Sequence, residues 1–270
     1  MQNEHALEVW ADVQAIRENA PLVHNITNYV VMNITANALL ALGASPVMAH
    51  AAEEVRDMTH IAGALVVNMG TLSHDWVESM KLAMEHALAI ETPVVFDPVG
   101  SGATPYRTET AHALLDTGAV SLIRGNASEI MSLVDDDVVT KGVDSSADSD
   151  SAFEAARKLA TKYDCAVCIS GETDYIVTKV WHAKIYNGNP MLPKVTGLGC
   201  VATALCGAFL AVNLSPSHAA AHAMAVMGVA GEMAVEKADG PGTLQLHFLD
   251  ALYNLTVEDL EERLRMETCA

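Results

Sequence analysis

The stretch Val195-Thr196-Gly197-Leu198-Gly199-Cys200 precedes an apolar run, Val201 to Leu214, that is long enough for about four helical turns. Its two glycines allow the backbone to turn sharply, so the free N–H groups in the first turn of the next helix point into the bend. The helix dipole adds partial positive charge there, which favours an anion such as a nucleotide phosphate. Cys200 stands at the mouth of this bend with a side chain that can ionise. The pattern therefore predicts an anion-binding turn, and a kinase site is the first hypothesis.

The same residues admit a second interpretation, because Gly197, Gly199 and Ala202 match the GxGxxA pattern of dinucleotide-binding folds. That fingerprint requires a strand before it and a second strand, ending in Asp or Glu, about 20 residues later. Upstream, 187–190 (NGNP) has the turn chemistry of a hairpin, and downstream 218–234 is an Ala-rich helical stretch. Spacing therefore favours phosphate binding over dinucleotide binding.

Composition limits the fold and the partners. The 270 residues suffice for one substantial core, and with 51% hydrophobic but only 5% aromatic residues that core must consist of aliphatic side chains, as in helices packed on a sheet. A net charge of −19 argues against a nucleic-acid partner or an anionic membrane surface. An acidic protein that binds ATP needs local compensation, so we expect a divalent metal and a few cations, with Arg124 and Lys194 as candidates.

Targeting and redox signals are weak. The first ten residues are acidic and lack an apolar run, which indicates no signal peptide and predicts a cytoplasmic location. Five cysteines fit free thiols better than a disulfide framework. Cys165 and Cys168 form a CxxC within a predicted strand, where residues three apart face opposite sides of the sheet, so we expect core thiols. Polar residues interrupt the apolar runs after Cys200, which argues against a transmembrane span.

Strand and helix patterns alternate along the chain. Helices are expected at 6–17, 30–42, 105–115 and 152–163, with another after an N-cap at Ser73; strands are expected at 45–48, 64–68, 94–96, 120–123 and 166–169, with antiparallel strands at 175–178 and 181–186. Leu22 and Val23 read as an apolar pair that leads into a polar turn, and 140–150 as a polar surface connection. The alternation predicts an α/β fold with a mostly parallel central sheet, helices on both faces and a short antiparallel edge, in one domain spanning 1–270.

Small polar loops follow five of these segments: HNITN at 24–28, NMGT at 68–71, DPVGSG at 97–102, RGN at 124–126 and SGETD at 170–174. In open α/β sheets, ligands bind beyond the carboxyl ends of the strands. Five such loops at the same edge predict a ligand site there.

Together with VTGLGC at 195–200, these loops resemble the hydroxyethylthiazole kinase family of the ribokinase-like superfamily, in order from Pro21 to beyond Cys200. Cys200 is the most specific feature, because most ribokinase-like kinases carry aspartate at that position of the motif. The resemblance implies phosphorylation of the primary hydroxyl of 4-methyl-5-(2-hydroxyethyl)thiazole by ATP with Mg²⁺, in thiamine salvage. It also implies a homotrimer with the substrate near subunit boundaries.

The resemblance carries over to individual residues of this chain. It implies that Cys200 is catalytic, that Arg124, Ser170 and Asn126 contact ATP, that Met48, Gly197, Asn25 and Gly70 contact the thiazole, and that Asp97 and Glu129 hold the magnesium. A helix N-terminus lowers the pKa of a thiol from about 8.5, so we expect part of Cys200 to be thiolate at neutral pH and to act as the base.

Structural roles compete with these assignments. Asn126 and Glu129 have the spacing of a capping box, Asp97 can hold a turn, Met48 can fill the core and Arg124 can pair with nearby acids. Three other functions also compete: a kinase for another alcohol such as the pyrimidine half of thiamine, for which we expect aspartate in place of Cys200; an NAD-dependent oxidoreductase; and a nucleotide-sensing protein without catalysis.

Overall fold

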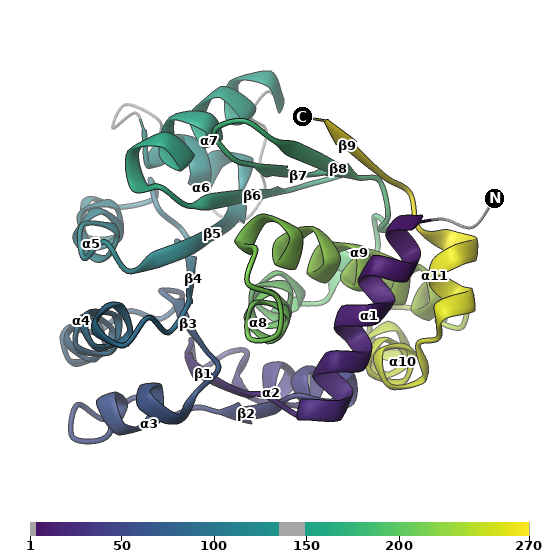
Figure 1. Cartoon of the computed structure of the whole chain (residues 1–270), viewed down its shortest axis with the longest axis horizontal. Coiled ribbons are helices and arrows are strands. Elements are labelled where there is room, and N and C mark those ends of the chain that lie inside the picture. Colours follow the sequence, from purple (N-terminus) through teal and green to yellow (C-terminus); the bar gives the residue numbers. More distant parts are fainter. Residues whose placement is uncertain (1–3, 135–148, 270) are drawn as a thin grey trace.

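Short runs of apolar residues build a nine-stranded sheet with the order β2-β1-β3-β4-β5-β6-β7-β8-β9 (Figure 1). The computed structural model describes residues 4–134 and 149–269. The strands are β1 (Leu22–Ile26), β2 (Ser45–Val47), β3 (Ala64–Asn68), β4 (Val94–Asp97), β5 (Val120–Asn126), β6 (Ala166–Ser170), β7 (Asp174–Val177), β8 (His182–Ile185) and β9 (Met266–Cys269). Neighbouring strands from β2 to β6 are parallel, whereas β7, β8 and β9 pair antiparallel. The predicted mostly parallel sheet with an antiparallel edge is confirmed.

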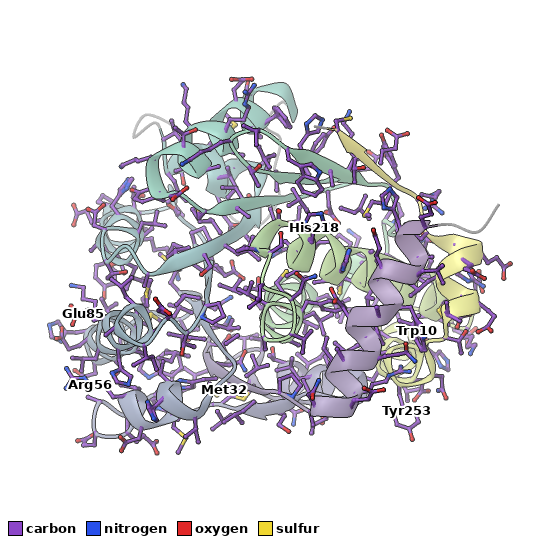
Figure 2. All side chains as sticks on the ribbon, viewed as in Figure 1. Trp10, Met32, Arg56, Glu85, His218 and Tyr253 are labelled. Carbon is purple, nitrogen blue, oxygen red and sulfur yellow. The ribbon has the colours of Figure 1, made fainter. Side chains whose placement is uncertain are left out.

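Helices cover both faces of the sheet, as predicted (Figure 1). One face carries α3 (Val55–Ile61), α4 (His74–Ala89), α5 (Pro105–Leu115), α6 (Ala127–Ser132) and α7 (Ser149–Tyr163), and the other carries α1 (Glu4–Asn19), α2 (Met32–Leu42), α8 (Leu198–Leu210), α9 (Pro216–Val235), α10 (Pro241–Asn254) and α11 (Val257–Arg263). Charged side chains such as Arg56 on α3 and Glu85 on α4 point away from the sheet into solvent (Figure 2). Aliphatic side chains fill both layers between, as the composition predicts.

Helix α8 lies directly on the central strands. It is apolar on all sides because it packs on the sheet with one side and on α2 and α9 with others. A Cβ built at Gly207 would lie 2.5 Å from Cγ2 of Val66 on β3 and 3.1 Å from Cγ1 of Val23 on β1. Glycine is therefore required for this close approach, which fixes the height of α8 above the sheet.

Strand β1 differs from the prediction, which stopped the apolar pattern after Val23 and placed a polar turn there. The strand continues to Ile26 with His24 and Asn25 buried. A buried imidazole needs hydrogen bonds, and here His24 Nδ1 lies 3.1 Å from Thr59 Oγ1 while Nε2 lies 2.8 Å from the Ala49 carbonyl oxygen. These partners lie 35 and 25 residues away along the chain, so the sequence does not show them. The polar residues after Val23 therefore led to a strand end that was predicted too early.

The hairpin turn also differs from the prediction. Strands β7 and β8 are joined at Thr178–Trp181, where the Thr178 N–H donates to the Trp181 carbonyl at 2.8 Å. Segment 187–190 is not a hairpin turn: it leads into the 3₁₀-helix η1 (Leu192–Lys194), and the Asn187 side chain donates to the Arg263 carbonyl at 2.8 Å. Strand β9, which pairs with β8, extends the antiparallel edge beyond the predicted two strands.

Other expectations have mixed outcomes. Cysteines are free thiols throughout the described residues, and Cys165 and Cys168 are buried as expected. Within the described ranges no helix is long and apolar enough to cross a membrane. The predicted connection at 140–150 lies outside the described residues up to 148, and α7 begins at Ser149. The single domain over 1–270 stays a prediction.

Candidate active site

The parallel strands place their polar exits at one edge of the sheet. Asn68 at the end of β3 pairs in register with Asp97 at the end of β4, and Asn126 on β5 pairs with Ser170 on β6. Helix α8 begins at the same edge, because the Thr203 hydroxyl of its second turn donates to Asp97 Oδ2 at 2.6 Å. The predicted convergence of loops at the carboxyl ends is therefore present.

Asp97 is the most constrained acid at this edge. It is 1% exposed, and its Oδ2 accepts hydrogen bonds from Thr203 and, at 2.8 Å, from Asn68 Nδ2. Its Oδ1 is buried and has no hydrogen-bond partner among the described residues. Burial raises the pKa of Asp97 to about 7; the Arg124 charge opposes this shift, whereas the Glu129 charge adds to it. The carboxylate thus lacks sufficient compensation for its charge.

The turn before α8 has the geometry predicted for an anion site. Gly197 adopts a φ of +88°, and a Cβ there would lie 2.7 Å from Val31 Cγ1, so only glycine fits. Helix α8 starts at Leu198, which leaves the first N–H groups without intrahelical acceptors. The 3₁₀-helix η1, rather than the strand of a dinucleotide fingerprint, precedes the turn.

Cys200 lies in the first turn of α8 and is partly buried. Its Sγ accepts a hydrogen bond from Asn28 Nδ2 at 3.4 Å. Burial and, to a smaller extent, the Asp97 charge raise the pKa of Cys200 to about 11. The expectation of a depressed thiol pKa is therefore wrong, because desolvation and a neighbouring carboxylate outweigh the helix dipole. Cys200 is a protonated thiol at neutral pH.

Arg124 supplies the positive charge of the site. Its Nη2 donates to Ser170 Oγ at 2.7 Å, and Nη1 is adjacent to Gly199, where an added Cβ would lie 3.2 Å away. Burial disfavours the charged guanidinium, but the surrounding acids, Asp97 foremost, raise its pKa overall. The predicted ATP contacts Arg124 and Ser170 thus lie together beside the anion turn. Lys194, the other predicted cation, is exposed on η1.

Asn126 and Glu129 form the capping box that the sequence spacing allows. The Asn126 side chain accepts from the Glu129 N–H at 2.9 Å, and Glu129 Oε2 accepts from the Asn126 N–H at 2.9 Å. Glu129 Oε1 accepts from the Gly100 N–H at 2.8 Å, which ties the exit loop of β4 to α6. Both Glu129 oxygens therefore already serve the fold.

The candidate thiazole contacts lie at the β1 and β3 side of the edge. Met48 is half-buried just after β2, and Asn25 is buried in β1. Asn25 Nδ2 donates to the Val23 carbonyl at 2.9 Å, whereas its Oδ1 lacks a partner among the residues described. Gly70 follows β3, and its lack of a side chain leaves room for Asn28, since a Cβ there would lie 2.6 Å from Asn28 Nδ2.

Sequence reasoning missed several residues that organise the site. Arg107 on α5 donates to the carbonyls of Met69 (2.8 Å), Gly70 (2.6 Å) and Val99 (2.7 Å), so it holds together the exit loops of β3 and β4. Asn28, Asn68, Thr203 and Asp174 were missed as well. The available signal was an amide or carboxylate directly at a strand end, as in NMGT and SGETD, but nothing local indicated its partner.

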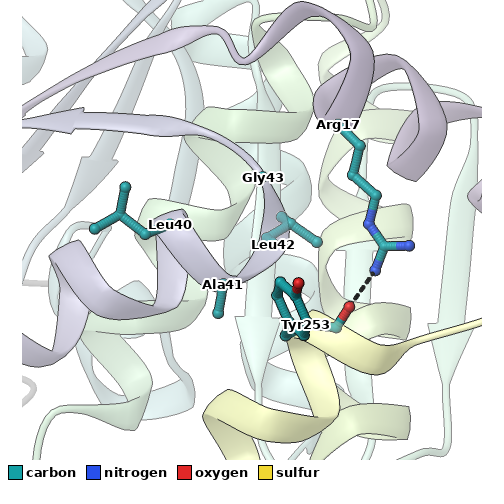
Figure 3. Close-up of a pocket in the computed structure, with 6 residues that line it drawn as sticks. All are labelled: Arg17, Leu40, Ala41, Leu42, Gly43 and Tyr253. Carbon is teal, nitrogen blue, oxygen red and sulfur yellow. Dashed lines mark hydrogen bonds between the residues drawn. The ribbon is translucent and has the colours of Figure 1, made fainter.

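One pocket of the structure lies away from this edge of the sheet. This pocket of about 300 Å³ is lined by Arg17, Leu40, Ala41, Leu42, Gly43 and Tyr253, where Arg17 reaches carbonyls at the end of α10 (Figure 3). Across the described residues there is no group of three or more His, Cys, Asp or Glu side chains able to hold a metal.

Comparison with known proteins identifies the family. A sequence model of the hydroxyethylthiazole kinase family matches residues 13–258. A hydroxyethylthiazole kinase from Syntrophus aciditrophicus is 60% identical over 258 residues, which is 95% of this chain and 96% of that protein. The structure of a hydroxyethylthiazole kinase protein from Pyrococcus horikoshii superposes with a TM-score of 0.91 at 38% identity, over 98% of this chain and 100% of that chain.

A more distant comparison concerns the fold alone. A ribokinase-like superfamily protein from Enterococcus faecalis has a TM-score of 0.60 at 12% identity, covering 87% of this chain and 88% of that one. The predicted ribokinase-like fold and the predicted kinase type are confirmed, and the oxidoreductase alternative is discarded. The chain belongs to the hydroxyethylthiazole kinase family.

Proposed function

We propose that this protein transfers the terminal phosphoryl group of ATP to the primary hydroxyl of 4-methyl-5-(2-hydroxyethyl)thiazole, a step of thiamine salvage. One observation carries the proposal: the glycine turn of α8, the Arg124 guanidinium and the buried Asp97 meet at one edge of the sheet beside Cys200. Phosphoryl transfer requires little covalent chemistry from the protein, and positioning with charge stabilisation supplies most of the rate.

ATP binds, in this proposal, with its phosphates against the first turn of α8. The N–H groups of that turn and the Arg124 guanidinium donate to phosphate oxygens. Ser170 orients Arg124 through the 2.7 Å hydrogen bond. Asn126 keeps the adjacent α6 N-terminus in place through its cap. A guanidinium suits this role because its planar fork of N–H groups can make two parallel hydrogen bonds to a phosphate.

The thiazole alcohol binds on the β1–β3 side, with Met48 and the backbone at Gly197 and Gly70 as contacts. The half-buried thioether of Met48 is soft enough to pack on a sulfur-containing ring. Asn25 Oδ1 is a buried acceptor without a partner among the described residues, which supports a place for Asn25 in the wall of the ligand pocket. These roles place the hydroxyl between Cys200 and the terminal phosphate.

Cys200 acts on the hydroxyl as a thiol at neutral pH, since its pKa is about 11 before substrates bind. In a loose transition state the hydroxyl proton leaves late, after most of the bond to the leaving group has broken. Cys200 therefore orients the hydroxyl through a weak hydrogen bond during attack. The hydroxyl proton is passed on late, to an oxygen of the transferred phosphoryl group, and Cys200 keeps its own proton throughout.

Of the two candidate magnesium ligands, Asp97 is better suited to bind the ion than Glu129. Asp97 offers a buried Oδ1 that has no hydrogen-bond partner among the described residues, as a cation ligand requires. Glu129 has both oxygens engaged by backbone N–H groups, so it would reach a metal only through water. Bound Mg²⁺ would neutralise charge on the phosphates during transfer.

A cytoplasmic homotrimer with sites near subunit boundaries completes the proposal. Tyr29 and Val30 are 63% and 64% exposed beside the site residue Asn28, and such apolar exposure supports a subunit contact there. Light scattering on the purified protein tests the trimer: a mass of one or two chains contradicts it.

The deciding experiment measures ADP release by purified protein with ATP, magnesium and either the thiazole alcohol or the pyrimidine alcohol of thiamine. We expect turnover with the thiazole alcohol at a kcat/KM well above that with the pyrimidine alcohol. Absence of turnover with the thiazole alcohol, or preference for the pyrimidine, contradicts the proposal.

A further inference from the structure

Two asparagines that no site assignment includes connect Cys200 with Asp97. Asn28 Nδ2 donates to Cys200 Sγ at 3.4 Å and to Asn68 Oδ1 at 2.8 Å. Asn68 Nδ2 in turn donates to Asp97 Oδ2 at 2.8 Å. Both asparagines are buried, with 4% and 1% of their surface exposed. A continuous amide chain therefore runs from the carboxylate at the end of β4, through the end of β3 and the loop after β1, to the thiol.

The direction of this chain is fixed at both ends. Asp97 Oδ2 acts as an acceptor, since it also accepts from the Thr203 hydroxyl, so Asn68 turns its amino group toward Asp97 and its oxygen toward Asn28. That oxygen also accepts from the Gly70 N–H at 3.0 Å. Asn28 must then present its amino group, and its own oxygen accepts from the Val30 N–H at 3.2 Å. Flipping either amide would set acceptor against acceptor, so one arrangement satisfies every group.

The absence of a side chain at Gly70 provides the space that Asn28 occupies. A Cβ built at Gly70 would lie 2.6 Å from Asn28 Nδ2 and 2.7 Å from its Cγ, so any other residue at Gly70 displaces the amide. Because Gly70 has no side chain, the Asn28 amino group can occupy the space beside the thiol. This gives Gly70 a role separate from any contact with substrate.

We propose that Asn28 is a positioning residue of the phosphoryl transfer: as the last member of an amide chain that starts at Asp97 and passes through Asn68, it holds the Cys200 thiol in the orientation that meets the substrate hydroxyl. The inference rests on the proposed function for its kinetic consequence. Its structural part, the contact between the Asn28 amide and Cys200, stands independently of turnover.

The kinetic test is a double-mutant cycle with Asn28→Ala and Cys200→Ala, measured with ATP varied at saturating thiazole alcohol and magnesium. We expect Asn28→Ala to lower kcat by about tenfold or more with KM for ATP changed less than about twofold, as expected for a residue that acts on orientation. In the Cys200→Ala background the same substitution should change kcat by less than about twofold, because the thiol that it positions is gone. Equal losses in both backgrounds, or no loss in the parent, overturn the proposal.

Two further variants separate positioning from folding. Gly70→Ala displaces the Asn28 amide without deleting it and should show the same dependence on Cys200; if its loss of kcat is equally large without Cys200, the chain does not act through the thiol. Asn37→Ala removes an exposed asparagine of α2 and serves as the matched control, with kcat and melting temperature expected to match the parent. Gly70→Ala, compared with Asn37→Ala as its control, therefore still decides the test if Asn28→Ala does not fold.

A measurement without turnover separates this inference from the proposed function. In protein labelled with ¹⁵N-asparagine, the side-chain amide signal of Asn28 should shift on Cys200→Ala, whereas that of Asn37 should not. An unshifted Asn28 signal overturns the contact. Absence of turnover by the parent together with a shifted signal would instead refute the proposed function and leave the contact standing.

Discussion

Replacing Arg124 by alanine should weaken ATP binding far more than binding of the thiazole alcohol. In the structure one guanidinium nitrogen, Nη2, is engaged by Ser170, and Nε has no partner within the described residues. Nη1 lies next to the anion turn at Gly199. The side chain can therefore offer one or two charge-assisted bonds to phosphate, and loss of one such bond costs about 1.5–3 kcal/mol. This corresponds to about a 10- to 150-fold rise in the dissociation constant for ATP.

A second consequence follows from the acids around Arg124. Its charge opposes the rise in the pKa of Asp97, so Arg124→Ala should leave Asp97 protonated to a higher pH. A protonated carboxyl binds magnesium poorly, and the magnesium concentration for half-maximal rate should therefore rise as well.

Isothermal titration with a non-hydrolysable ATP analogue, and separately with the thiazole alcohol, measures the two affinities. Arg56→Ala, which removes an exposed arginine of α3, is the matched control and should change neither (Figure 2). Melting curves exclude misfolding. Equal weakening of both ligands, or unaltered affinity for the ATP analogue, would refute the assignment of Arg124 to the phosphates.

Cys200→Ala should lower kcat by about 10- to 100-fold with little change in thiazole affinity, because it removes the group that orients the hydroxyl, while Cys200→Asp should retain activity; an alanine variant equal to the parent from pH 6 to 9 shows that the thiol only packs. Asp97→Asn should raise the magnesium requirement and alter the pH dependence of stability. The folded-state pKa of Asp97, about 7, exceeds the ordinary value of 3.8, so its contribution to the free energy of unfolding is fully present below pH 3.8 and is lost as pH rises through 7. The melting temperature of the parent relative to Asp97→Asn should therefore fall between pH 4 and 8, and a constant difference contradicts the shift. Glu129→Gln should lower the melting temperature with unaltered magnesium dependence, because both oxygens cap backbone N–H groups; the reverse pattern in a melt and a magnesium titration would make it a metal residue.

Elements with strong local signals were predictable from the sequence. The run Ala64–Asn68, the N-cap at Ser73 and the helix Pro105–Leu115 have local periodicity or capping, and each is present where expected. Strand β9 has no such signal, because its burial is slight and it pairs with β8, about eighty residues earlier. Pairing over that separation is a tertiary property that local patterns do not contain.

The site was predictable in its parts but not in its electrostatics. The loops and Arg124 could be placed because parallel strands bring their carboxyl ends together. The pKa of Cys200 could not, since the helix N-terminus is visible in the sequence whereas burial and the approach of Asp97 are not. Asn28 and Asn68 were hidden for the same reason: their partners lie 172, 40 and 29 residues away along the chain.

Gly207 allows α8 to pack closely on the sheet, and this close packing makes the active site sensitive to substitution at that position. Gly207 lies seven residues after Cys200, about 10 Å further along the same helix and on a similar side of it. A methyl group at Gly207 would collide with Val66. The collision would tilt α8 relative to the sheet. The tilt would displace the N-terminal end of α8, which carries the Cys200 thiol and the phosphate-binding turn. Inactivity caused by a substitution two turns away would then mimic a defect in catalysis, although no group that touches a reactant has changed.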